Sequence, residues 1–165
     1  MDYKLCRRIS GTLFLTANLS LFFANFTDTN IYQLIASLLF ISCSTCLILS
    51  AKNHRWLFYC SFALIGGAIL VAISNRGEGD HLNLVGMIVG ISAGLLDLRA
   101  AMQRETGKQY KLPFILKSFD KYPLAMGSLT EQVFNIFILG GAILNNDIRL
   151  AVIIFLWMIA HSFLI

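Results

Sequence analysis

Two apolar stretches separated by a five-residue connection, four residues of which are polar, decide the fold: IYQLIASLLFISCSTCLILS at 31–50, AKNHR at 51–55 and WLFYCSFALIGGAILVAIS at 56–74. At about 1.5 Å per residue, each stretch forms a helix of about 30 Å, which matches the hydrocarbon thickness of a bilayer. A helix is expected because lipid offers no hydrogen-bond partners to an open strand or loop. This segment therefore predicts two membrane-spanning helices joined by a short turn.

The same alternation extends over the whole chain. Hydrophobic residues make up 57% of the 165 residues and charged residues 13%, with a mean hydropathy of +0.71, whereas a soluble domain carries about 25% charge. We predict a single-domain, all-α, polytopic membrane protein with six transmembrane helices and a cytoplasmic interfacial segment at 99–122. This segment is expected to begin as a charged continuation of the fourth helix, which stops near Gly107. The predicted helices are 9–26, 31–50, 56–74, 82–98, 123–144 and 149–165.

Basic residues are distributed unevenly between the polar connections. Eleven of the thirteen Lys and Arg residues fall at the N-terminus, at 51–55 and in the segment 99–122. Short loops rich in Lys and Arg remain in the cytoplasm, so both termini are predicted to be cytoplasmic, in a bacterial inner (plasma) membrane. The eleven are Lys4, Arg7, Arg8, Lys52, Arg55, Arg99, Arg104, Lys108, Lys111, Lys117 and Lys121, and the other two are Arg76 and Arg149.

The two ends of the chain each carry one open question. The first apolar stretch follows three basic residues, as in a signal peptide, but it lacks a small-x-small cleavage site, so we expect it to be retained as the first span. The last stretch stops at Ile165 inside an apolar run. Either the terminal carboxylate lies at the cytoplasmic interface, or the natural chain continues further.

Three glycines in the fourth stretch are the clearest packing signal. Gly86, Gly90 and Gly94 follow one another at a spacing of four residues, which forms a flat stripe for close approach of another helix. Asp97 follows Gly94 by three residues and projects from nearly the same face. The carboxylate either belongs to this helix contact or pairs locally with Arg99 or a loop lysine.

Four polar residues in the apolar stretches, besides Asp97, are candidates for a functional site. Glu131 and His161 are expected at similar depths on consecutive antiparallel helices, where a carboxylate and an imidazole could share a proton or hold a cation. Asn135 follows Glu131 by one turn, and Asn18 of the first span, which lies deeper than Gln33 of the second, should face protein rather than lipid. The alternative is that Ser128 and Glu131 form a capping box at a helix start, with His161 at the interface.

One helix resembles a known transporter family. The sequence LVGMIVGISAGLLDLRAAMQRETGK at 84–108 is similar to the opening helix of PQ-loop (SWEET-like) small transporters, with an early glycine, small residues along one face and a basic exit. The Pro-Gln pair of that family is absent, and Asp97-Leu98 stands about where it would fall, so no functional residue is carried across. A faint similarity between residues 7–74 and 82–165 also predicts two inverted three-helix units, although two apolar segments also align by chance.

Several function classes are excluded by the pattern. The basic residues flank spans, which favours topology and lipid headgroups over nucleic acid. The sequence has no nucleophile–base pair, phosphate-binding loop or His cluster with metal spacing, so we predict no enzyme, cofactor or metal. The Cys43-x-x-Cys46 motif lies inside the second span, where cysteines act as small residues between helices.

Two functions remain for such a chain. The first is a small multi-pass transporter or permease for a small solute or ion, with a polar site made by Asn18, Asp97, Glu131, Asn135 and His161. The second is a non-catalytic subunit or assembly partner of a larger membrane complex or homo-oligomer. Convergence of these polar groups inside the bundle favours a transporter, and their dispersal favours a subunit.

Cysteine labelling in a background without the four native cysteines tests the orientation. Asp28→Cys, Glu78→Cys and Asn146→Cys should react with an impermeant maleimide added outside intact cells. Lys52→Cys and Lys111→Cys should react only when the inner face is exposed, because their loops carry the basic excess. Labelling of residues 108–121 from outside would contradict the orientation.

Overall fold

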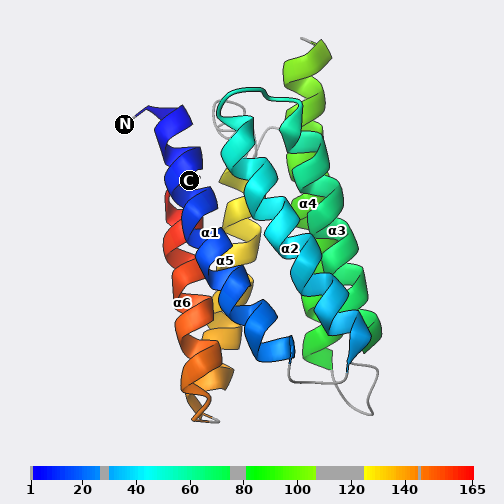
Figure 1. Ribbon diagram of the computed structural model, residues 1–165, viewed down its shortest axis with the longest axis vertical. Helices are drawn as coiled ribbons and strands as arrows, with labels where there is room; N and C mark the ends of the chain where they lie inside the picture. Colours follow the sequence, from blue (N-terminus) through cyan, green and yellow to red (C-terminus); the bar gives the residue numbers. More distant parts are fainter. Residues whose placement is uncertain (1, 27–29, 75–80, 107–124, 145) are drawn as a thin grey trace.

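The computed structural model describes residues 2–26, 30–74, 81–106, 125–144 and 146–165, and the described secondary structure is entirely helical (Figure 1). The predicted all-α class is confirmed. The helices are α1 (Tyr3–Phe26), α2 (Ile31–Ser50), α3 (Trp56–Ser74), α4 (His81–Thr106), α5 (Ala125–Leu144) and α6 (Ile148–Ser162).

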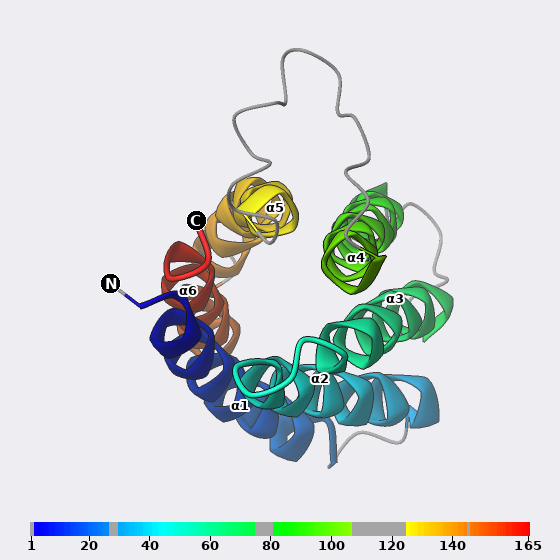
Figure 2. The same cartoon turned by 90° about the horizontal axis from the view of Figure 1, so that it is seen from above.

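The helices form a closed ring in chain order. Each helix packs against the next one, and α6 returns to pack against α1 (Figure 2). Both chain termini, the α2–α3 turn and the C-terminal end of α4 lie at one end of the ring (Figure 1). We call this the basic end, because it carries Lys4, Arg7, Arg8, Lys52, Arg55 and Arg99, whereas Arg149 lies at the opposite end.

Several helices are suited to a membrane. Within the described residues, α1, α2, α3 and the segment Gly127–Leu144 of α5 are long and apolar enough to cross a bilayer. Helix α6 is also apolar but has 15 residues.

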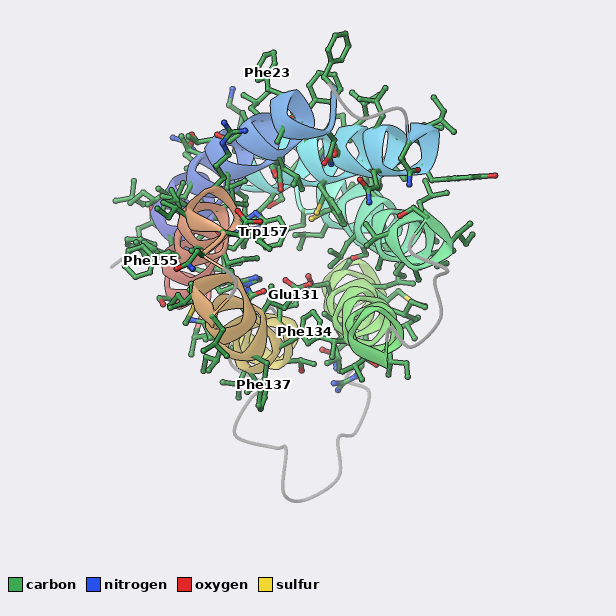
Figure 3. All side chains as sticks on the ribbon, turned by 90° about the horizontal axis from the view of Figure 1, so that it is seen from below. Phe23, Glu131, Phe134, Phe137, Phe155 and Trp157 are labelled. Atoms are coloured by element: carbon green, nitrogen blue, oxygen red, sulfur yellow. The ribbon has the colours of Figure 1, made fainter. Side chains whose placement is uncertain are left out.

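The distribution of side-chain sizes is the reverse of that in a soluble bundle. The residues buried between helices include many small ones that have no exposed surface, such as Ala17, Ala36, Ser61 and Ala160. Large apolar side chains instead cover the outside, where Phe23, Phe137 and Phe155 point away from the ring (Figure 3). Small residues at helix contacts and an apolar outer surface are expected when lipid surrounds the helices.

Two predicted boundaries need correction, and a third expectation is met. Helix α1 begins at Tyr3 rather than at 9. Hydropathy marks the part of a helix that suits lipid, and the charged turns beyond it remain helical. Helix α4 continues past its apolar stretch to Thr106, next to Gly107, where the sequence predicted its end. The rest of the predicted interfacial segment, at 107–122, lies outside the described residues. At the other end, α6 stops at Ser162 rather than at 165.

Of the two alternatives for Glu131, the capping box with Ser128 is the wrong one. Helix α5 is already helical at Ala125, so Ser128 lies inside it and is buried. Glu131 is therefore almost two turns inside the helix. The caps that the structure shows are elsewhere: Asn30 accepts hydrogen bonds from the backbone of Tyr32 and Gln33 at the start of α2.

The glycine stripe of α4 faces α3. A Cβ atom added to Gly90 would lie 2.6 Å from the Cβ of Ala68, and one added to Gly94 would meet the side chain of Ile65. The surroundings of Gly86 are outside the described part of the chain. Gly11 plays a similar role in α1, since an added Cβ would lie 3.2 Å from the carbonyl oxygen of Ser44 in α2. Glycine is needed at these positions because the helices approach closely there.

The contact at Gly90 predicts a difference between two identical substitutions. Gly90→Leu should lower the thermal stability of the detergent-purified protein by about 1–3 kcal/mol, since Ala68 cannot move without moving its helix. Gly140→Leu is the control, because an added Cβ at this exposed residue of α5 meets nothing within 4 Å. Equal melting temperatures for the two variants would show that the α3–α4 contact is not as close as described.

Candidate functional site

A carboxylate and an imidazole meet inside the ring. Glu131 of α5 and His161 of α6 lie 2.7 Å apart, measured from Oε2 to Nε2, and their side chains are 18% and 6% exposed. Their proximity follows from their matching depths on antiparallel neighbours. Glu131 points into the interior of the ring, not along the start of its own helix (Figure 3).

The pair lies well inside the ring. The ring of Phe14 packs edge-on against His161 at a centroid distance of 4.6 Å, so the two residues share one level. Phe14 is six residues beyond Arg8 in α1, which corresponds to about 9 Å along the helix axis. On α1, the level of the pair is therefore about two turns from Arg8, whereas on α6 His161 itself lies in the last helical turn.

Asp97 approaches the pair from α4. A Cβ atom on Gly127 of α5 would lie 2.6 Å from Oδ1 of Asp97, so this carboxylate is pressed against α5 one turn before Glu131. The charges of Asp97 and Glu131 are close enough to act on each other. Asp97 thus belongs to the contact between α4 and α5, and not to the contact of the glycine stripe with α3, where its spacing from Gly94 had placed it.

Two amides of α5 complete the cluster. Asn135 is 4% exposed and follows Glu131 by one turn on the same face. Gln132 donates hydrogen bonds to the carbonyl of Met158 at 3.0 Å and to Oγ of Ser162 at 3.1 Å, both in α6. Gln132 therefore holds α5 against α6 beside the pair. In the sequence, only its position next to Glu131 indicated that Gln132 belongs to the cluster.

The cluster has unused hydrogen-bonding capacity. Five of its buried polar atoms have no hydrogen-bond partner among the described residues, whereas buried polar groups in proteins are normally paired. Inside an apolar ring such groups are expensive, which is typical of a site for a solute or a proton. The five atoms are Asp97 Oδ1, Glu131 Oε1, Gln132 Oε1, Asn135 Nδ2 and His161 Nδ1.

Asn18 belongs to a separate and fully bonded network. Its Nδ2 donates to Oγ of Ser44 at 2.8 Å and to the carbonyl of Phe40 at 3.2 Å. Its Oδ1 accepts from Nε1 of Trp157 at 3.1 Å, so one amide joins α1, α2 and α6. The roles of Ser44 and Trp157 were not predicted, since nothing in a single sequence pairs them with Asn18. We assign Asn18 to the framework of the site.

Arg7 also has a place that its sequence position did not indicate. It is 1% exposed, and its Nη1 donates to the carbonyl of Ser50 at 2.9 Å and lies 3.2 Å from Nδ1 of His54. The guanidinium also lies over the ring of Tyr3. This residue therefore ties α1 to the end of α2 and the following turn, in addition to any effect on topology.

The cysteine contact in the structure joins two helices and not the two members of the Cys-x-x-Cys motif. The sulfur of Cys43 in α2 lies 3.3 Å from that of Cys60 in α3. All four cysteines are free thiols. Within the described residues, no group of three or more His, Cys, Asp or Glu side chains is arranged to hold a metal ion.

The chemistry available to the cluster is exchange of protons and binding of positive charge. Two carboxylates, one imidazole and two amides converge from α4, α5 and α6, and Phe134 and Trp157 point into the same interior (Figure 3). No protein-family model, curated protein or solved structure matches this chain.

The Asn18 network predicts a stability effect. Asn18→Leu keeps the volume but leaves Nε1 of Trp157 and the hydroxyl of Ser44 without this partner, so the protein should lose about 1–3 kcal/mol of stability. Ser20→Ala removes an exposed hydroxyl that bonds only to its own helix, and it should change little. Thermal unfolding of both purified variants, followed by circular dichroism, gives the comparison.

Proposed function

We propose that this protein is a small proton-coupled permease that moves a small solute or ion across a membrane. The observation that carries the proposal is the 2.7 Å contact between Glu131 and His161 inside an apolar ring. Ionisable groups are costly at such a depth and are retained in membrane proteins chiefly along pathways for ions, protons or substrates. A structural helix contact would be made at lower cost by apolar or small side chains.

The proposal includes six membrane spans with both termini in the cytoplasm of a bacterial cell. Support comes from the single end of the ring at which the described basic residues gather, apart from Arg149. It also comes from the apolar outward side chains of α6, although the 15 residues of this helix cover only about 22 Å. The exposed Phe155 and Val152 would then face lipid.

Proton exchange follows from the chemistry of the pair. A carboxylate and an imidazole in contact can hold one proton between them, and the imidazole has a second nitrogen that can pass the proton on. Nδ1 of His161 has no partner among the described residues, so this second nitrogen is available. A cycle of protonation would change the charge of the interior, and a change of charge can drive a change of conformation.

Two sequence features agree with a transporter. Residues 84–108, which include most of α4, resemble the opening helix of PQ-loop transporters, and α4 supplies Asp97 to the cluster. An inverted pair of three-helix units would assign α1–α3 to one arc of the ring and α4–α6 to the other. All of the cluster would then come from the second unit.

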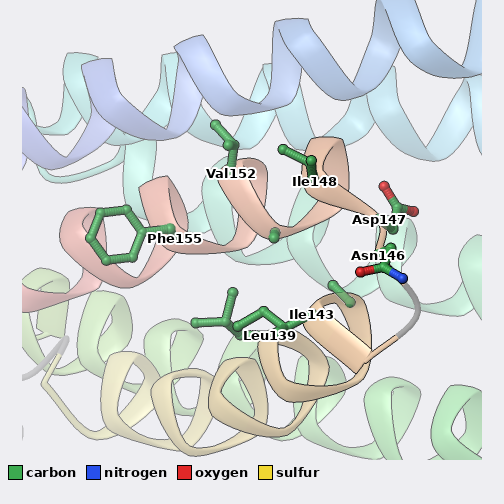
Figure 4. A pocket seen from close by; sticks show the side chains of 9 residues that line it. Leu139, Ile143, Asn146, Asp147, Ile148, Val152 and Phe155 are labelled. Atoms are coloured by element: carbon green, nitrogen blue, oxygen red, sulfur yellow. The ribbon is translucent and has the colours of Figure 1, made fainter.

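A second candidate is a subunit of a larger membrane assembly. It is favoured by an apolar groove of about 420 Å³ between α5 and α6, on the outside of the ring near the end opposite the basic end (Figure 4). Its lining includes Leu139, Ile143, Ile148, Val152 and Phe155. A partner helix or a second copy bound there would raise the molecular mass of the purified particle above that of one chain in its detergent micelle.

Proton flux into liposomes tests the permease. Protein reconstituted into liposomes that contain a pH-sensitive dye should acidify the interior when a potassium diffusion potential, negative inside, is imposed. Glu131→Gln should reduce the initial rate at least about tenfold, because the amide cannot exchange a proton at this site.

The control removes a carboxylate elsewhere. Asp147 is exposed at the start of α6 and caps that helix by accepting from the backbone of Leu150. Asp147→Asn keeps the cap, so its flux should equal that of the parent protein. The same flux in Glu131→Gln as in the parent, with both variants folded, would rule out the proposed role of the pair.

A further inference from the structure

The cluster holds more acidic than basic groups. With both carboxylates ionised, Asp97 and Glu131 carry two negative charges, against which His161 supplies at most one positive charge. Among the described residues, α1 and α3 contribute no cationic side chain to the cluster. Helix α1 contributes Phe14, and α3 contributes the thiol of Cys60, which is close enough to Asp97 for their charges to interact. Arg99 lies two residues after Asp97, about 200° away around α4. The site therefore needs a proton or a bound cation for neutrality.

The unused hydrogen-bonding atoms indicate what kind of cation fits. Oδ1 of Asp97, Oε1 of Glu131 and Oε1 of Gln132 are oxygens that accept hydrogen bonds, and they are buried without a partner among the described residues. His161 is nine-tenths buried, and its Nδ1 can accept when the ring is neutral. A ligand that donates several N–H groups matches this set.

The surroundings favour an organic cation over a hydrated inorganic ion. Phe14 packs on His161, and Phe134 and Trp157 point into the same interior as Glu131 (Figure 3). Aromatic faces attract ammonium and guanidinium groups and bury the attached carbon atoms. An inorganic ion that keeps its water shell gains little from such walls.

We infer that the solute is a small monovalent organic cation with N–H donors, of the ammonium or guanidinium class, which binds at Asp97 and Glu131 in exchange for a proton. This rests on the proposed permease. When the cation enters, the Glu131–His161 pair keeps its proton, and the second proton, which neutralises the charge that remains on the two carboxylates, leaves to water, so one positive charge replaces another. Because the same negative charge cannot be neutralised twice, the cation and the proton exclude each other. Movement of the cation in one direction therefore drives protons in the other, and without the cation the site carries protons alone.

Proton release from the purified protein tests this step without requiring transport. Methylguanidinium chloride is the probe, because it stays protonated at neutral pH and donates N–H groups. Added to the detergent-solubilised protein in weakly buffered dye solution, it should release about one proton per chain. Urea is the uncharged control, tetramethylammonium is the cation without N–H donors, and sodium chloride is the inorganic cation at the same ionic strength.

The variants define which groups respond. Glu131→Gln should abolish the proton release, and Asp97→Asn should weaken the apparent affinity at least about tenfold by removing a charge-assisted hydrogen bond. Asp147→Asn should behave as the parent protein, because its carboxylate is exposed at the opposite end. Proton release that survives in Glu131→Gln would overturn the assignment.

The outcomes separate the solute from the permease. The inferred solute class is overturned if the liposomes show proton flux but methylguanidinium releases no proton from the purified protein. It is also overturned if sodium or tetramethylammonium releases protons equally. In both cases the proposed permease is still supported. Specific release with no flux in liposomes supports the binding site and overturns the permease. Methylguanidinium-driven proton efflux from acid-loaded liposomes, lost in Glu131→Gln, supports both.

Discussion

The absence of hydrogen-bond partners in lipid governs how this chain is arranged. Every backbone group of a spanning segment must bond within its own helix, so helices are the form available to it. Polar side chains also need hydrogen-bond partners within the protein, so they must turn inward or bond to one another. Asn18 has such partners for both its amide nitrogen and its oxygen, in two other helices. The ring is therefore a shell that is apolar outside and accommodates polar groups inside.

Close packing of small residues then holds the shell together. Because lipid is as apolar as the helix surfaces, burial of large side chains drives association weakly, and backbone proximity matters more. Gly11 lies against α2 and Gly90 against α3, at distances that an added methyl group would obstruct. Helix α5 is held against its neighbours in a different way. Gln132 donates a hydrogen bond to α6, and Gly127 leaves room for Asp97 of α4 to approach closely. Polar contacts and small residues thus work together where the site is built.

The sequence predicted the helices better than it predicted their neighbours. Apolar length located α2 and α3 to the residue, because their ends coincide with polar turns, but it misplaced the start of α1, where charged turns stay helical. Glu131 and His161 could be predicted to meet, because they lie at similar depths on helices that are consecutive in the chain. The hydrogen bond between Trp157 and Asn18 could not be predicted in this way, because it depends on the packing of α6 against α1. Closure of the ring cannot be read from periodicity.

Asp97 is the residue that changes what the interior can do. A carboxylate and an imidazole alone can reach neutrality by transferring one proton between them, and such a pair needs nothing from outside. A second carboxylate close to the first leaves one negative charge that the pair cannot remove. An unpaired charge is costly in apolar surroundings, and a proton or a cation beside it lowers that cost. The small size of Gly127, which lets Asp97 approach α5, is therefore the feature on which the proposed preference for positive charge depends.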